Sequence, residues 1–129
     1  MSLQVIEKKV FKNPHGTIAV IVSQYHQSIG DNLLKGFKEE IKPYPGIEME
    51  VFEVPGAFEI PLKAQEIAEG KYYATIVALG AIVKGDTYHF EQVAHESARG
   101  CMEVMLKFGI PVVYQVLSVY RLEDAVKRS

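Results

Sequence analysis

The stretch "TIVALGAIVKGDTYHFEQVAHESARG", residues 75–100, decides how this sequence folds. It opens with an apolar run, Ile76 to Val83, which only Gly80 interrupts. A short turn of mostly polar residues follows, and a helical repeat of apolar residues begins at His89. The stretch therefore predicts a buried strand, a tight loop and a helix. In an α/β fold, ligands bind where such a strand ends and such a helix begins.

Three further apolar runs are each followed by a segment with helical spacing, so the same unit repeats along the chain. We expect Ser28 to be the N-cap of the first helix and residues 118–120 to form the last strand-end loop. The predicted strands are 17–23, 48–53, 72–83 and 111–117, and the predicted helices are 28–41, 61–69, 89–108 and 122–128. This alternation predicts an α/β fold: a three-layer α-β-α sandwich with a four-stranded parallel sheet, as in flavodoxin-like proteins.

Composition narrows the functional classes. The chain has 129 residues, 48% of them hydrophobic, so we expect one folded domain over residues 1–129. A net charge of -2 leaves no basic surface of the kind that nucleic acid requires. The single cysteine, Cys101, allows no disulfide within the chain, and we expect it to be a buried core thiol. No metal-ligand spacing, membrane span or signal peptide is evident, and we expect a cytoplasmic protein.

Side chains that are useful for binding follow the ends of all four predicted strands. Because the carboxyl ends of parallel strands meet at one edge of a sheet, we expect these side chains to lie close together. Aromatic rings there offer stacking surfaces for a planar ring, and free N–H groups before a helix suit a phosphate. The residues are Tyr25; Ala57, Phe58 and Glu59; Lys84 to His89; and Tyr114 with residues 118–128. The sequence thus predicts a pocket for a flat ring and a phosphate, beside a histidine.

Several of these residues have both a functional and a simpler structural interpretation. His89 is suited to proton transfer near neutral pH, but a histidine at a helix start is often only a capping or core residue. Tyr25 is equally well explained as a surface aromatic. The helix dipole alone accounts for Glu59 at the start of a helix. Either Lys84 or Arg128 has the charge to neutralise a phosphate.

Two motifs make the assignment more specific. "VPGAFEIP", Val54 to Pro61, and "ALGAIVKGDTYHFEQVAHESARG", Ala78 to Gly100, resemble the two most diagnostic motifs of the lumazine synthase family. The order of predicted elements also resembles that family from about residue 3 to residue 128. The resemblance implies condensation of 5-amino-6-(D-ribitylamino)uracil with 3,4-dihydroxy-2-butanone 4-phosphate to 6,7-dimethyl-8-ribityllumazine, the penultimate step of riboflavin biosynthesis. It implies a transferase that needs neither a metal nor an organic cofactor.

The resemblance also implies a role for each residue that matches a family motif. His89 is the implied general acid and base. The implied substrate-binding residues are Tyr25, Ala57, Phe58, Glu59, Ala81, Ile82, Val83, Asp86, Thr87, Tyr114 and Arg128. Among these, Tyr25 is implied to stack on the pyrimidine, whereas Tyr114 and Arg128 are implied to reach the site of a neighbouring subunit. The implied partners are therefore the two small-molecule substrates and further copies of the chain, assembled from pentamers.

The amino-terminal residues 3–6 are predicted to form a short edge strand without a hairpin partner. In the family, such a strand joins the sheet of a neighbour, and we expect the same here. The sequence departs from the family pattern at Gln115 and at residues 118–121, "SVYR", where a Thr-Thr-Asp-Thr-like turn is usual. A Gly/Lys-rich loop and a final helix, both usual in the family, do not follow Arg128 in this sequence.

Three alternatives stay open at this point. The departures over residues 115–121 and after Arg128 favour a non-catalytic assembly of the same fold that binds flavin or lumazine. An archaeal-type riboflavin synthase is a related enzyme, but its active-site motifs depart from "GDTYHF". A flavodoxin-like electron carrier needs a Ser/Thr-rich phosphate loop after the first strand, and residues 24–27 lack one.

Overall fold

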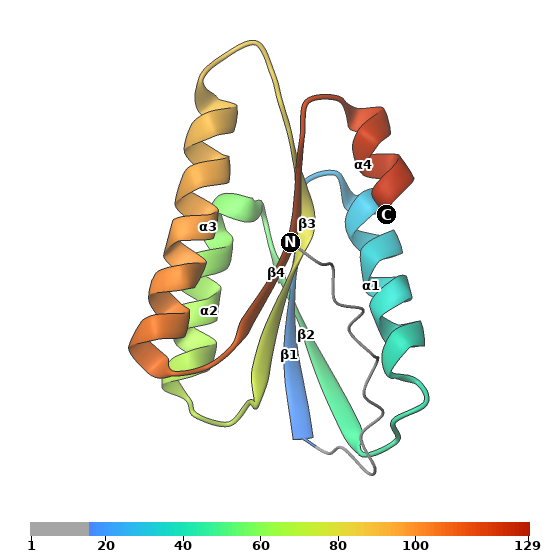
Figure 1. Ribbon diagram of the computed structural model, residues 1–129, viewed down its shortest axis with the longest axis vertical. Helices are drawn as coiled ribbons and strands as arrows, with labels where there is room; N and C mark the ends of the chain where they lie inside the picture. Colours follow the sequence, from blue (N-terminus) through green and yellow to red (C-terminus); the bar gives the residue numbers. More distant parts are fainter. Residues whose placement is uncertain (1–15) are drawn as a thin grey trace, which may run out of the picture.

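Strands and helices alternate along residues 16–129, the part of the chain that the computed structural model describes (Figure 1). The strands are β1 (Gly16–Ser23), β2 (Ile47–Val54), β3 (Thr75–Val83) and β4 (Val112–Val119). The helices are α1 (Gln27–Ile41), α2 (Ile60–Glu69), α3 (His89–Phe108) and α4 (Leu122–Arg128), and a 3-10 turn, η1 (Ala57–Glu59), leads into α2. The strand predicted at residues 3–6 lies outside the described residues.

The four strands form one parallel sheet in the order β2-β1-β3-β4. Helices α2 and α3 cover one face of this sheet, and α1 and α4 cover the other (Figure 1). The predicted three-layer α-β-α sandwich with a parallel sheet is therefore confirmed. Within residues 16–129, no helix is both long enough and apolar enough to cross a membrane.

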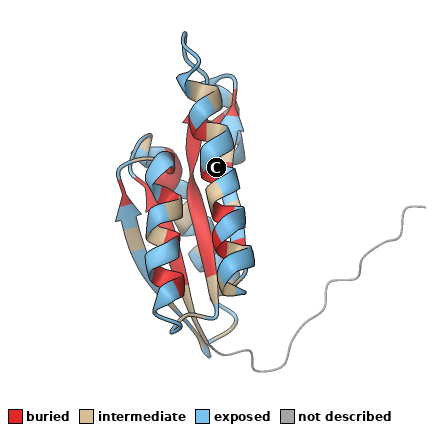
Figure 2. Ribbon diagram, turned by 90° about the vertical axis from the view of Figure 1, so that its left-hand side faces the viewer, coloured by how far each residue is buried: buried red, intermediate tan, exposed pale blue. Residues whose placement is uncertain are grey.

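The two central strands, β1 and β3, carry the core. Along β1, Ala19 and Ile21 pack in the cluster beneath α2 and α3, whereas Val20 and Val22 pack beneath α1. Because both faces are covered, these strands are continuous apolar runs and do not alternate with polar residues. Figure 2 shows the buried residues along the central strand and on the inward sides of the helices. Each buried Val or Ile side chain contributes about 1.5–3 kcal/mol to folding.

Two glycines allow close approaches that shape the sheet edge. A Cβ atom on Gly80 would lie 2.1 Å from the Oγ of Ser23 on the neighbouring strand. A Cβ atom on Gly100, in the middle of α3, would lie 2.6 Å from the Cβ of Pro61 at the start of α2. These contacts bring β1 close to β3 and α3 close to α2, immediately below the edge where the strands end. The Ser23 hydroxyl is buried and has no hydrogen-bond partner among the described residues.

The start of α1 differs from the prediction. The helix begins at Gln27, and its N-cap is His26, whose φ of 57° and ψ of 56° are left-handed. Its carbonyl oxygen accepts hydrogen bonds from the N–H groups of Ile29 (3.0 Å) and Gly30 (3.3 Å). The prediction of Ser28 as the N-cap is wrong, because Ser28 already lies within the first helical turn. The cap comes from backbone geometry, and no side-chain hydrogen bond supports it.

The end of β4 also differs. The strand was predicted at residues 111–117 with a loop over 118–120, but it continues to Val119. Pairing with β3 explains the difference, because Ser118 aligns with Ile82 and Val119 aligns with Val83. The Lys84 N–H then donates to the Val119 carbonyl oxygen at 2.9 Å. The neighbouring strand thus extends β4 by hydrogen bonding that local sequence does not reveal.

Candidate functional site at the carboxyl edge of the sheet

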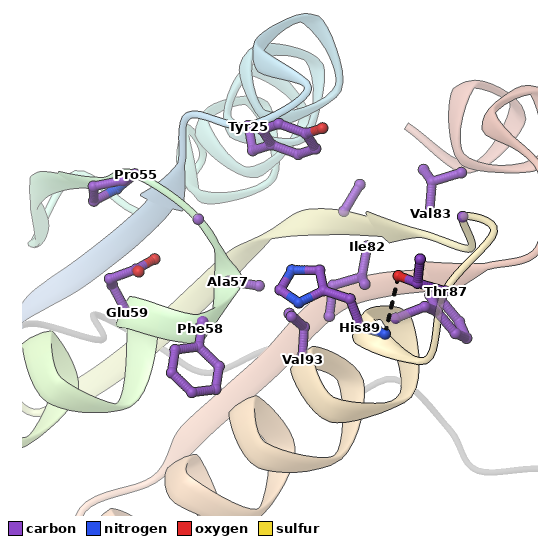
Figure 3. A pocket seen from close by; sticks show the side chains of 14 residues that line it. Tyr25, Pro55, Ala57, Phe58, Glu59, Ile82, Val83, Thr87, His89 and Val93 are labelled. Atoms are coloured by element: carbon purple, nitrogen blue, oxygen red, sulfur yellow. Dashed lines mark hydrogen bonds between the residues drawn. The ribbon is translucent and has the colours of Figure 1, made fainter.

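A cavity of about 540 Å³ lies at the carboxyl edge of the sheet, where segments from different parts of the chain meet (Figure 3). It is built by the residues after β1 and β2, the end of β3, and the start of α3. The predicted site residues that line it are Tyr25, Ala57, Phe58, Glu59, Ala81, Ile82, Val83, Thr87 and His89. Apolar walls with a few polar groups and a size of several hundred cubic ångströms are typical of small-molecule sites.

Tyr25 follows β1 and forms one wall of the cavity. Its ring is 69% exposed and packs edge-on against the His26 ring, with ring centroids 4.6 Å apart. The Gln24 N–H donates to the Val54 carbonyl oxygen at 2.8 Å, and the Tyr25 N–H donates to the Pro55 carbonyl oxygen at 3.0 Å. Two backbone hydrogen bonds therefore fix the segment after β1 to the segment after β2, and the open ring face is available for stacking.

The segment after β2 forms the second wall through the η1 turn. Phe58 is 57% exposed, and its ring lies beside the cavity (Figure 3). The Glu59 N–H donates to the Gly56 carbonyl oxygen at 3.2 Å, which closes the turn. The Glu59 carboxylate lies back over Gly56, since a Cβ there would be 3.2 Å from Oε2. This wall thus offers one aromatic ring and one carboxylate that accepts hydrogen bonds from hydroxyl groups.

The end of β3 forms the floor. Ala81 and Ile82 are buried, and Val83 is half-buried. Pairing with β1 ends at Leu79, whereas pairing with β4 continues to Val83. Among the described strands, none pairs with residues 81–83 on the β1 side, so backbone N–H and C=O groups there are available to a ligand. A planar heterocycle with donors and acceptors on its edge matches such a floor.

The third wall is the loop of residues 84–88 with the first turn of α3. Gly85 and Thr87 line the cavity, and His89 points its imidazole into it (Figure 3). The His89 N–H donates to the Thr87 Oγ1 at 3.4 Å. This wall combines an imidazole, a hydroxyl and the positive end of the helix dipole, which favours an anionic group.

Asp86, Tyr114 and Arg128 do not line this cavity, although they were predicted as site residues. The Tyr114 side chain extends from β4 towards α3, where its hydroxyl is 2.8 Å from the Oγ of Ser97. Burial raises the pKa of this phenol. The Arg128 guanidinium is at the end of α4 and donates to the Asp124 carbonyl oxygen at 2.9 Å. Neither side chain therefore contributes to the cavity within one chain, and the expectation that both reach the site of a neighbouring subunit stays a prediction.

The cavity also contains residues that the sequence prediction missed. They are Pro55, Gly56, Phe90 and Val93. All of them belong to the two motifs that carry the resemblance, and Val93 lies one helical turn after His89. Helical spacing would have identified it, because residues four positions apart share a face. Phe90 and Val93 belong to the core cluster beneath α2 and α3 and also line the cavity.

The charges around the cavity are few. Its lining contains no Lys or Arg within the described residues, so only Glu59 and His89 among the lining side chains can carry charge near neutral pH. Residues 16–129 contain no group of three or more His, Cys, Asp or Glu side chains that could hold a metal ion. The chemistry available in one chain is therefore ring stacking, backbone hydrogen bonding and proton transfer.

A comparison with known protein families agrees with this geometry. A family model described as 6,7-dimethyl-8-ribityllumazine synthase matches residues 15–129. The matched range includes all of the residues that line the cavity. Since the match covers far more than half of the chain, the protein belongs to the 6,7-dimethyl-8-ribityllumazine synthase family.

Proposed function

We propose that this protein condenses 5-amino-6-(D-ribitylamino)uracil with 3,4-dihydroxy-2-butanone 4-phosphate to form 6,7-dimethyl-8-ribityllumazine. One observation carries the proposal: both family motifs and the segment after β1 surround a single cavity into which His89 points. Membership of the family supports a place in riboflavin biosynthesis. In this proposal, residues 16–129 belong to a single catalytic domain.

Each wall of the cavity has a proposed task. The pyrimidine ring stacks on Tyr25, and its edge bonds to the free backbone groups of residues 81–83. The Glu59 carboxylate and the η1 turn hold the ribityl chain, which is rich in hydroxyl groups. The phosphate of the second substrate lies at the loop of residues 84–88, where Thr87 and the start of α3 favour an anion.

The reaction needs proton transfers, which is the role proposed for His89. The primary amine of the pyrimidine attacks the ketone, and water leaves as the imine forms. A proton is then removed as phosphate leaves, and the second nitrogen closes the ring with loss of another water molecule. One phosphate and two water molecules are released, so the atoms balance without any oxidant or reductant. An imidazole is suited to move these protons because it exchanges them near neutral pH.

The proposed assembly is a homo-oligomer built from pentamers. Among the described residues, no Lys or Arg lines the cavity of one chain, and in this proposal a neighbour supplies Arg128 for the phosphate and Tyr114 for the ring. Native mass spectrometry tests this directly, because the proposal expects masses in multiples of five chains. A protein that stays monomeric at working concentration would contradict the proposed assembly.

The decisive experiment mixes the two substrates with purified protein and follows the absorbance of the lumazine product. His89→Ala should slow product formation, whereas His95→Ala should not. His95 is the matched control, because it lies on the exposed side of the same helix and does not line the cavity. A folded, assembled protein that forms no lumazine would refute the proposed reaction.

A second candidate function is a non-catalytic assembly that binds flavin or lumazine. No Lys or Arg among residues 16–129 lines the cavity, and this favours the second candidate because uncharged rings need no cation. The arginine in the unusual turn does not supply one, since Arg121 pairs with Glu123 at 3.2 Å and with Asp124 at 3.7 Å. Tight flavin binding without condensation would favour this candidate, and turnover would exclude it.

A further inference from the structure

The loop of residues 84–88 lines the cavity but is itself exposed along its whole length. The loop after β1 is fixed by two backbone hydrogen bonds to the segment after β2, whereas the 84–88 loop makes one to its neighbour, from the Lys84 N–H to the Val119 carbonyl oxygen. A loop that binds a ligand with high affinity needs a defined conformation, because ordering it on binding costs conformational entropy. The support for the 84–88 loop must therefore come from outside the cavity.

That support comes from Tyr120, in the turn between β4 and α4. The Nζ of Lys84, at the start of the loop, is 5.3 Å from the centroid of the Tyr120 ring. The ring of Phe90, just beyond the end of the loop, is 6.1 Å from the same ring at a tilted angle. One exposed ring thus contacts both ends of the loop, and Phe90 in turn lines the cavity.

The backbone strengthens this arrangement. Because Lys84 N–H donates to the carbonyl oxygen of Val119, the residue just before Tyr120, the ring is placed directly over the start of the loop. The next residue, Arg121, turns away to its ion pairs with Glu123 and Asp124. Tyr120 is therefore the side chain of this turn that reaches the loop. It belongs to the segment 118–121, where the sequence departs from the family pattern.

We propose that Tyr120 is a positioning residue: its ring holds the 84–88 loop in the conformation that binds the phosphate-bearing substrate. The inference rests on the proposed function for the identity of that substrate. Tyr120 does not line the cavity, and it acts through Lys84 and Phe90. Its effect should therefore fall on the affinity for the phosphate substrate, with little effect on the pyrimidine or on the chemical step.

The kinetic test compares Tyr120→Ala and Tyr120→Phe with the unmodified protein, varying each substrate separately. Tyr120→Ala should raise the KM for the butanone phosphate about 3- to 10-fold, since one cation–π contact and one ring contact are lost. The KM for the pyrimidine and the kcat should stay within about twofold, as expected for a contact that acts on one substrate. Tyr120→Phe should behave like the unmodified protein, because the ring is retained. Tyr72→Ala is the control, since Tyr72 is a similarly exposed tyrosine that does not line the cavity.

Hydrogen exchange of the peptide spanning residues 84–92 gives a readout that does not depend on activity. Exchange should become faster in Tyr120→Ala and stay unchanged in Tyr120→Phe. If the unmodified protein makes no lumazine, the proposed reaction fails, and hydrogen exchange alone then decides whether Tyr120 orders the loop. Unchanged exchange in Tyr120→Ala would overturn the proposal. An equal rise in both KM values, or a Tyr120→Phe variant that resembles Tyr120→Ala, would overturn it as well.

Discussion

The two loops that face each other across the cavity are held in place by different means. Backbone hydrogen bonds to Val54 and Pro55 fix the loop that carries Tyr25. The loop that carries Gly85 and Thr87 has a backbone hydrogen bond at its start, from the Lys84 N–H to the Val119 carbonyl oxygen, and the Tyr120 ring adds side-chain contacts with Lys84 and Phe90. Backbone hydrogen bonds tolerate many side-chain substitutions, whereas a ring contact is lost with a single one. The difference teaches that the side proposed to bind the ring is held by backbone hydrogen bonds, whereas the side proposed to bind the phosphate also relies on particular side chains.

The largest expected effect is on kcat and concerns His89, which lies just after the 84–88 loop and is proposed to transfer protons. His89→Ala should lower kcat by about 100-fold or more, because general acid–base catalysis contributes that much. Assembly and thermal stability should stay unchanged, since the His89 side chain is exposed. Stopped-flow absorbance of the product measures the rate, with His95→Ala as the control. A kcat equal to that of the control would remove His89 from the mechanism.

The next effect concerns Arg128, the cation that a neighbouring chain is proposed to supply to the phosphate. Arg128→Ala should weaken binding of the butanone phosphate by about ten- to a hundred-fold, corresponding to about 1.5–3 kcal/mol for one charge-assisted contact. Lys127→Ala is the matched control, because Lys127 is the neighbouring cation on the same short helix. Isothermal titration with each substrate separates the two affinities. A loss of affinity confined to the pyrimidine substrate would contradict the proposal that Arg128 binds the phosphate.

A third effect is on stability and tests the close approach of β1 and β3 at Gly80 and Ser23. Gly80→Ala should lower the free energy of unfolding by about 1–3 kcal/mol, because the added Cβ overlaps the Ser23 Oγ. Adding Ser23→Gly to the same chain should recover part of this loss, since the obstructing atoms are removed. Gly36→Ala is the control. It has open space around its Cβ within α1, and it should stabilise the helix by up to about 1 kcal/mol. Urea unfolding measures all four proteins, and equal stability of Gly80→Ala and the unmodified protein would contradict the close approach.

The smallest effect concerns Cys101 in α3. It tests whether a change in the 84–88 loop caused by Tyr120→Ala also disturbs the packing of that helix. Burial raises the pKa of the Cys101 thiol to about 11. The native thiol should therefore resist a thiol reagent at pH 8, in the unmodified protein and in Tyr120→Ala alike, and react on unfolding. The raised pKa adds stability that is complete below the unfolded value near 8.5 and is lost as the pH rises through 11. Fast labelling of native Tyr120→Ala would show that the disturbance is not confined to the loop.

Local sequence was sufficient where one interaction dominates. The apolar run of β3 identifies a strand because both of its faces are covered, and α3 ends at Phe108 as predicted because Gly109 adopts a left-handed φ of 64°. Prediction failed where backbone geometry or a neighbouring strand decides. Ser28 has the favoured cap chemistry, yet the backbone of His26 caps α1. The end of β4 was missed because pairing with β3 extends it to Val119.

The candidate site follows the same rule. The two motifs placed Ala57, Thr87 and His89 around one cavity before any geometry was known. The contact of Tyr120 with Lys84 and Phe90 was not predictable, because it joins segments about 30 residues apart whose approach depends on the twist of the sheet. The roles proposed for Tyr114 and Arg128 involve a second chain, and the structure describes one chain. These residues therefore stay predictions.

Pairing of β3 with β1 ends at Leu79, whereas its pairing with β4 continues to Val83. This difference has a consequence for the evolution of the protein. The backbone groups of residues 81–83 that face β1 keep the same donors and acceptors whatever side chains are attached to them. Ordinary point mutations there alter shape but leave the hydrogen-bonding pattern intact, unless proline removes a donor. If these groups bind the edge of the ring, as proposed, that part of the specificity is inherited with the path of the main chain. It then persists when side chains on the surrounding loops change.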